Sequence, residues 1–269
     1  MSVAEALNGA LAPVTAGARA KVQIAGVSKS YDGKLALRRV DLELSENSFT
    51  CLLGPSGCGK STLLNMIAGF VPPTTGQILV DGRAVSGAGA DRGVVFQEYA
   101  LFPWRTALAN VEFGPLMRRR SAAERRETAR RYLKLVGLEA HRDKYPNELS
   151  GGMKQRVAIA RALANAPSVL LMDEPFGALD AQTREILQEE LLRIWQQERK
   201  TVVFVTHSIS EAIFLGDHIV VMATQPGAIK EVIEVTLPHP RDRSSPQFVQ
   251  MERRIKLLVR EEVQKLGVI

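Results

Sequence analysis

The sequence predicts an α/β fold with a parallel sheet and crossover helices, and two features predict it. In the C-terminal half, short apolar runs that are typical of strands alternate with helical segments. The expected strands are 169–172, 201–205 and 218–223, and the expected helices are 181–198 and 210–215. The second feature is a glycine-rich turn at 54–62, which follows the apolar run 49–53 and precedes a helix that ends at Gly69.

The rest of the chain is expected to add an antiparallel sheet and further helices. From Lys21 to Phe49, short apolar and polar runs alternate around Tyr31-Asp32-Gly33-Lys34, a good hairpin turn. Residues 106–165 are expected to be mostly helical. Residues 1–20 are rich in alanine and glycine without a clear period, which predicts a flexible N-terminal tail.

A C-terminal helix is expected to begin at Ser245 and Pro246, which are suited to the N-cap and to the first helical position. Its apolar residues recur on one helical face. They are Phe248, Met251, Ile255, Leu258, Val259 and Leu266.

Composition narrows the class of protein without deciding it. The chain has 269 residues, 45% of them hydrophobic and 24% charged, as is usual for a globular protein. No apolar run approaches the roughly 20 residues that cross a bilayer, and the N-terminus lacks the pattern of a secretory signal. Two cysteines are too few for a disulfide framework, so reducing cytoplasm is expected. The net charge of +6 suits a nucleotide, nucleic acid, anionic lipid headgroups or only a solubilising surface.

The turn GPSGCGKST fits the pattern G-x-x-x-x-G-K-[ST], which predicts a phosphate-binding loop. Glycines let backbone N–H groups face a phosphate, and the following helix start favours negative charge. Lys60 can reach the β- and γ-phosphates, and the Ser61 hydroxyl can hold Mg²⁺. The expected nucleotide-binding residues of this loop are Gly54, Pro55, Ser56, Gly57, Cys58, Gly59, Lys60, Ser61 and Thr62.

Two carboxylates follow the apolar run 169–172, at the strand end where ligands gather in open α/β sheets. Asp173 is expected to hold Mg²⁺ through water, and Glu174 to orient and deprotonate an attacking water. Taken alone, the pair could instead cap a helix. Beside a phosphate-binding loop, the catalytic interpretation is favoured.

A second glycine-rich element precedes another expected helix. Its sequence is Leu149-Ser150-Gly151-Gly152-Met153-Lys154-Gln155-Arg156. Ser150 and the two glycine N–H groups offer another anion-binding helix start, although an ordinary N-cap would look the same. Since one nucleotide needs only one phosphate loop, this element makes sense if it completes the site of a neighbouring copy.

The order of these motifs resembles the ATP-binding subunits of ATP-binding cassette (ABC) transporters, over residues 21 to about 225. The resemblance implies a P-loop NTPase (RecA-like) core with an antiparallel β subdomain and an α-helical subdomain, and it implies ATP and Mg²⁺ as cofactors. It also implies roles for residues that composition does not single out. Gln97 would contact Mg²⁺ and the attacking water, and Asp180 would cross a dimer interface. His207 would hold the γ-phosphate, and Tyr31 would stack on adenine.

The resemblance implies a homodimer that sandwiches two ATP molecules, each between the Gly54 loop of one copy and the Ser150 element of the other. Met153 departs from the glutamine of many relatives, with little effect expected. Cys58 lies beside Lys60 and a helix start, which predicts a thiolate whose alkylation inhibits the enzyme.

The expected boundaries are 21–238 for the ATP-binding domain, with a helical subdomain at about 98–160, and 239–269 for a C-terminal extension. The partners implied are membrane permease subunits and, indirectly, a periplasmic or lipid-anchored binding protein. Leu101-Phe102-Pro103-Trp104 is expected to receive a permease helix. The place implied is the cytoplasmic face of a bacterial inner membrane, and no nucleic acid is expected.

Finer resemblances concern the cargo. The segments 97–105, 176–184 and 238–241 look like the nitrate/sulfonate/taurine importer group, and 64–72 and 92–97 lean toward taurine and alkanesulfonate. Nitrate, bicarbonate or another small solute is the alternative cargo. A phosphotransferase kinase would have no use for Ser150 or His207. A soluble cassette ATPase that acts on nucleic acid or ribosomes is a further alternative, but such proteins usually carry two cassettes or long coiled coils.

Overall fold

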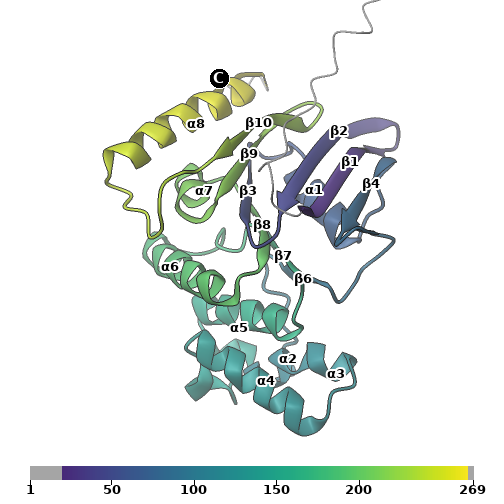
Figure 1. The fold of residues 1–269 in the computed structure, drawn as a ribbon. Coiled ribbons are helices and arrows are strands. Elements are labelled where there is room, and N and C mark those ends of the chain that lie inside the picture. The colour runs from purple at the N-terminus through teal and green to yellow at the C-terminus, as the bar shows by residue number, and fades with distance from the viewer. Residues whose placement is uncertain (1–19, 266–269) are drawn as a thin grey trace, which may run out of the picture.

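The computed structural model describes residues 20–265, which form two β-sheets with helices packed around them (Figure 1). The smaller sheet has the strand order β2-β1-β4-β5 and is antiparallel throughout. Its strands are β1 (Ala20–Tyr31), β2 (Lys34–Ser45), β4 (Thr75–Val80) and β5 (Arg83–Ala84). The predicted turn between β1 and β2 is confirmed. Asp32 and Gly33 have φ values of 48° and 76°, as a two-residue hairpin requires.

The larger sheet has the strand order β10-β9-β3-β8-β7-β6. Neighbouring strands from β9 to β6 are parallel, and only the edge strand β10 among these six runs antiparallel to its neighbour. The strands are β3 (Phe49–Leu53), β6 (Arg92–Val95), β7 (Val169–Asp173), β8 (Thr201–Thr206), β9 (His218–Ala223) and β10 (Ala228–Glu234). The predicted parallel sheet is therefore present, and β10 is an addition that the sequence pattern did not predict.

Both faces of the larger sheet are covered, and its central strands β3 and β8 are therefore buried along their whole length. Alternate side chains enter different cores: Leu52 packs with α1 (Lys60–Ala68) and the smaller sheet, whereas Leu53 packs with the other helices. The second face is covered by α5 (Gly151–Ala164), α6 (Ala181–Glu198) and α7 (Ile209–Leu215). Consequently α1 and α5 lie on opposite faces of one sheet.

The segment between β6 and β7 is mostly helical, as predicted, and it forms the lower end of the molecule in Figure 1. Its elements are α2 (Ala107–Val111), α3 (Phe113–Met117), α4 (Ala122–Leu135), the short 3₁₀ helices Glu139–His141 and Pro146–Glu148, and α5. Ser121 and Glu124 form a reciprocal capping box that fixes the start of α4.

The last described element is α8 (Pro246–Lys265), which lies at the top of Figure 1. Its predicted start is confirmed, because the Ser245 Oγ accepts from the backbone N of Phe248 at 3.3 Å. Phe248 and Ile255 are buried in the core on the α5 side of the sheet, whereas the expected contact residue Leu266 lies outside the described residues.

The predicted tail at 1–20 also falls almost wholly outside the described residues, and the domain boundaries stay predictions. Within residues 20–265, none of the helices combines the length and hydropathy needed to cross a membrane.

Candidate nucleotide site

The glycine-rich loop at 54–59 joins β3 to α1 and borders a cavity of about 240 Å³. Gly57 and Gly59 have φ values of 79° and 93°, a conformation that residues with a Cβ rarely adopt. Gly59 also lies against β2, since a Cβ on it would come within 3.0 Å of the Leu37 Cδ1. The cavity is lined by Ala36, Ser56, Gly57, Gly59, Lys60, Ser61, Thr62 and Glu174. A concave loop of this kind at a helix start suits an anionic phosphate.

Lys60 is the first residue of α1, and its side chain is buried within the loop. Its Nζ donates to the carbonyl oxygen of Gly54 at 2.7 Å and to that of Pro55 at 2.9 Å. The ammonium group is thereby fixed beside the phosphate cavity that Lys60 helps to line.

Cys58 is fully buried, and the predicted thiolate is wrong. Its Sγ lies 3.7 Å from the Lys60 Nζ, yet burial raises the pKa of the Cys58 thiol and outweighs the lysine charge and the backbone N–H groups. The thiol fills the space beside Gly54, where an added Cβ would lie only 2.9 Å from the sulfur. Cys58 is thus a packing residue of the loop.

Ser61 and Asp173 come together from α1 and the end of β7. The Ser61 hydroxyl donates to the Asp173 Oδ1 at 2.9 Å. Burial raises the pKa of Asp173, and the neighbouring Glu174 adds to this, while the Ser61 hydrogen bond and Lys60 oppose it. A partly desolvated carboxylate beside a hydroxyl is a pair of oxygen ligands that suits Mg²⁺.

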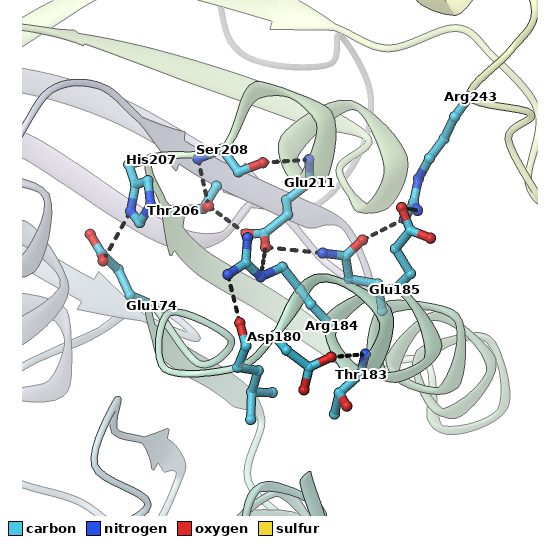
Figure 2. Close-up of polar contacts among 12 residues, drawn as sticks. Glu174, Asp180, Thr183, Arg184, Glu185, Thr206, His207, Ser208, Glu211 and Arg243 are labelled. Carbon is cyan, nitrogen blue, oxygen red and sulfur yellow. Dashed lines mark hydrogen bonds and ion pairs between the residues drawn. The ribbon is translucent and has the colours of Figure 1, made fainter. Parts of the chain in front are cut away.

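Glu174 and His207 point toward one another at the ends of two adjacent strands (Figure 2). The His207 Nδ1 lies within hydrogen-bond distance, 3.1 Å, of the Glu174 Oε2. Glu174 has a φ of 42°, and its backbone N donates to the carbonyl oxygen of Val205 at 3.0 Å. This backbone bond fixes the residue to β8, so its carboxylate lines the phosphate cavity.

Gln97 and Tyr31, two of the predicted site residues, lie outside the lining of this cavity. The Gln97 amide lies beside the turn before α6, where a Cβ on Gly177 would come within 3.3 Å of its Nε2. Tyr31 is the last residue of β1 and is 45% exposed, and the Lys29 Nζ lies 5.0 Å from its ring centroid.

The second glycine-rich element also lies away from the cavity. Ser150 is the N-cap of α5, and its hydroxyl accepts from the Met153 backbone N at 3.3 Å. Leu149 and Gly152 are buried there, while no residue of 149–153 lines the phosphate cavity of the same chain.

Asp180 is the N-cap of α6 and accepts from the Thr183 backbone N at 3.0 Å. This hydrogen bond lowers the pKa of Asp180 below its usual range.

Ala36 is the one residue in the lining of the phosphate cavity that the sequence did not suggest. It reaches the cavity because β2 lies against the loop, where a Cβ on Gly59 would come within 3.6 Å of the Ala36 carbonyl oxygen, and a lone alanine in a strand carries no signal of this.

The phosphate loop, Ser61 and Glu174 thus line one cavity, and Asp173 and His207 lie within hydrogen-bond distance of Ser61 and Glu174 respectively. The family model described as "ABC transporter" matches residues 37–177. The chain belongs to the ABC transporter family of ATP-binding proteins. It is an ABC ATPase, an enzyme that couples ATP hydrolysis to transport, as the motif order predicts.

Several relatives support this membership. An uncharacterised ABC transporter ATP-binding protein of Methanocaldococcus jannaschii is 56% identical over 86% of each chain. The nitrate import ATP-binding protein of Synechocystis is 46% identical over 89% of this chain and 95% of that protein. The bicarbonate transport ATP-binding protein of the same organism is 50% identical over 85% of each.

Solved structures confirm the predicted fold class. The ATP-binding cassette MJ0796, a dimer bound to ADP and Pi, aligns with a TM-score of 0.70 at 37% identity, over 81% of this chain and all of that one. The cbiO1 protein of Clostridium perfringens, part of the ABC transporter complex cbiONQ, has a TM-score of 0.75 at 26% identity, over 93% of this chain and 99% of that one. The relatives above whose names give a cargo carry nitrate or bicarbonate, rather than taurine or a sulfonate.

Proposed function

We propose that this chain hydrolyses ATP in the cavity beside the 54–59 loop and thereby powers an importer of small anions. The observation that carries the proposal is the place of Glu174, whose carboxylate lines the cavity and lies 3.1 Å from His207. A carboxylate there can orient the attacking water and accept its proton. His207 would hold the γ-phosphate, and Lys60 would bind the β- and γ-phosphates.

Mg²⁺ would be held by Ser61 and Asp173, with Gln97 as the further expected contact. The hydroxyl and the carboxylate are 2.9 Å apart, and oxygen ligands of these two kinds suit Mg²⁺ when nucleotide phosphates supply the rest. The described residues hold no cluster of three or more metal-ligating His, Cys, Asp or Glu side chains. When bound, Mg²⁺ would neutralise charge on the phosphates.

We infer that two copies of the chain share each ATP. The Ser150 element starts α5, whereas the phosphate loop precedes α1 on the opposite face of the larger sheet. A Ser150 element that lies outside its own chain's cavity is free to close over the phosphate loop of a second copy. Asp180, at the exposed start of α6, would lie in the same interface.

The permease would dock beside Gln97. A groove of about 460 Å³ lies next to Gln97, because Phe96, the residue before it, is part of the lining. The groove is lined largely by apolar side chains, including Phe102, Phe113 and Met117. Trp104, in the next turn, is 71% exposed. An apolar groove of this size suits an amphipathic helix of a membrane subunit. The chain would then work at the cytoplasmic face of the membrane, with a binding protein on the far side.

Nitrate or bicarbonate is the cargo that the named relatives favour, and taurine or an alkanesulfonate is the alternative that the sequence segments at 64–72 and 92–97 suggest. The cargo does not contact this subunit, so its identity must be read from transport in the host.

The test is deletion of the gene, complemented by the wild type, by Glu174→Gln or by Glu190→Gln. Glu190 pairs with Arg193 on α6 and lies outside the cavity lining, so its variant is a matched control. Growth is measured on nitrate, on limiting bicarbonate, and on taurine or an alkanesulfonate as the sulfur source.

We expect the deletion strain to grow poorly on nitrate or on limiting bicarbonate. Glu190→Gln should restore this growth, and Glu174→Gln should not. A growth defect confined to taurine or an alkanesulfonate would instead identify that compound as the cargo. Full growth with Glu174→Gln on the affected source would contradict the assigned role of Glu174.

A further inference from the structure

Glu211 is a buried carboxylate of α7 that has no place in the nucleotide cavity. The residue is 7% exposed, and it lies at the centre of a polar network beside the turn that carries His207 (Figure 2). Burying a carboxylate is costly unless each oxygen is paired. The partners of Glu211 therefore indicate what the residue is for.

One oxygen of Glu211 fixes the turn that carries His207. The Thr206 hydroxyl donates to the Glu211 Oε2 at 2.6 Å, and the Thr206 Oγ1 itself accepts from the Ser208 backbone N at 2.9 Å. Thr206 and Ser208 flank His207 on both sides. The carboxylate thus determines the backbone path at His207 without touching its ring.

The other oxygen of Glu211 reaches the turn that ends at Asp180. The Arg184 Nε lies 3.8 Å from the Glu211 Oε1, and the Arg184 Nη2 donates to the carbonyl oxygen of Leu179 at 2.8 Å. Leu179 directly precedes Asp180, the expected interface residue. A single carboxylate therefore joins the turn before α6 to the turn after β8.

Gln188 and Arg243 complete the network from α6 and the C-terminal segment. The Gln188 Nε2 donates to the Glu211 Oε1 at 3.0 Å, and the Gln188 Oε1 accepts from Arg243. Arg243 also pairs with Glu185 at 3.1 Å and lies 4.1 Å above the Phe214 ring. These contacts orient the Gln188 amide, so it can only donate toward Glu211.

We propose that Glu211 is a positioning residue for ATP hydrolysis, which sets the His207 turn and the Leu179-Asp180 turn relative to one another. The proposal rests on the proposed function, because it acts through His207 and Asp180. A displacement of about 1 Å at a reacting group can lower a rate by up to about 100-fold. Loss of the carboxylate should therefore lower turnover while the phosphate loop still binds ATP.

The test compares purified Glu211→Gln with the wild type and with Glu190→Gln, the same change at a carboxylate of α6 outside the network. The readouts are kcat per active site, with active sites counted from single-turnover amplitudes, and the affinity for a fluorescent ATP analogue. We expect kcat to fall about tenfold or more in Glu211→Gln, with affinity within about threefold of the wild type and no change in Glu190→Gln. A purely structural role would lower the amplitude and leave kcat per active site unchanged.

Exchange of the two partners tests the geometry directly. In Glu211→Gln combined with Gln188→Glu, the carboxylate and the amide change places, and the carboxylate stays next to the arginines. We expect kcat to recover to within about threefold of the wild type. If Glu211→Gln does not fold, Thr206→Val breaks the link to the His207 turn alone and should lower kcat in the same direction.

An equal kcat for Glu211→Gln and Glu190→Gln would overturn the proposal, and so would a double variant no better than the single one. Failure of the proposed function gives a different result. In that case the wild type does not hydrolyse ATP, or Glu174→Gln hydrolyses it at the wild-type rate.

Discussion

Asn110 should hold the Leu101–Trp104 loop in place, and Asn110→Ala tests this. The side chain is fully buried in α2. Its Oδ1 accepts from the Phe102 backbone N at 2.9 Å, and its Nδ2 donates to the carbonyl oxygens of Phe102, Arg105 and Thr106 at 3.2, 3.0 and 3.0 Å.

The structure sets the size of the expected loss. Nδ2 carries two hydrogens for three acceptors, so Asn110 makes at most three full hydrogen bonds. At about 1 kcal/mol for each net bond, Asn110→Ala should lower the free energy of unfolding by about 3 kcal/mol. Phe102 packs against Phe113 with ring centroids 4.7 Å apart, and loosening it would disturb the proposed permease groove.

The assay is chemical denaturation, together with amide hydrogen exchange over residues 101–106. The matched control is Asn165→Ala, which removes a side chain with one hydrogen bond, at 3.3 Å to the carbonyl oxygen of Ala90, and should cost less than about 1 kcal/mol. An Asn110→Ala protein as stable as the control, with unchanged exchange at 101–106, would refute the reasoning.

Three further predictions concern reactivity and stability. Cys58 should react with iodoacetamide much more slowly at pH 7 than a free thiol and faster as the pH rises, because burial raises its pKa; fast labelling at pH 7 that Cys58→Ala abolishes would contradict this. Burial raises the pKa of Glu262, but hydrogen bonds, the largest of them from Lys230, lower it to about 2. The ionised Glu262 carboxylate therefore stabilises the folded protein fully above about pH 5, and this stabilisation is lost as the pH falls toward 2. The difference in unfolding free energy between wild type and Glu262→Gln should shrink over that range, and a constant difference would argue against the ion pair. Phe248→Ala, at a buried position of α8, should cost about 3 to 5 kcal/mol, whereas Leu257→Ala, at an exposed position of the same helix, should change stability by less than about 0.5 kcal/mol; equal losses in the two would show that α8 does not dock as described.

Local sequence patterns predicted the elements whose structure is decided locally. The strands at 49–53, 169–172, 201–205 and 218–223 begin and end within one residue of the observed bounds, since each is a short apolar run between polar turns. The phosphate loop was equally evident, because the lysine and glycines that bind phosphate lie in nine consecutive residues.

Features that depend on distant partners were missed. The edge strand β10 has lysine and glutamate among its apolar residues, so its pattern is weak without β9 beside it. Asn110 and Glu211 lie in helical segments, where a polar residue usually faces solvent, and only the folded chain brings their partners to them. The resemblance of the segment 238–241 to an importer group predicts no structural role for Arg241, yet its guanidinium donates to carbonyl oxygens at the end of α7, including that of Gly216 at 2.7 Å.

The thiolate predicted at Cys58 was wrong for a related reason. The sequence places Cys58 two residues from Lys60, and the positive charge is indeed 3.7 Å away. Whether that charge or burial prevails depends on how much water reaches the sulfur, and that is set by the packing of Gly54, Met222 and their neighbours.

The most direct test of the central claim is hydrolysis of ATP by purified Glu174→Gln beside the wild type, with dimer formation measured in the same samples. If Glu174 is the base at this cavity, the variant should bind ATP and accumulate as an ATP-bound dimer, while its turnover falls about 100-fold or more. Turnover close to that of the wild type would contradict the account, because the carboxylate would then have no part in the chemistry.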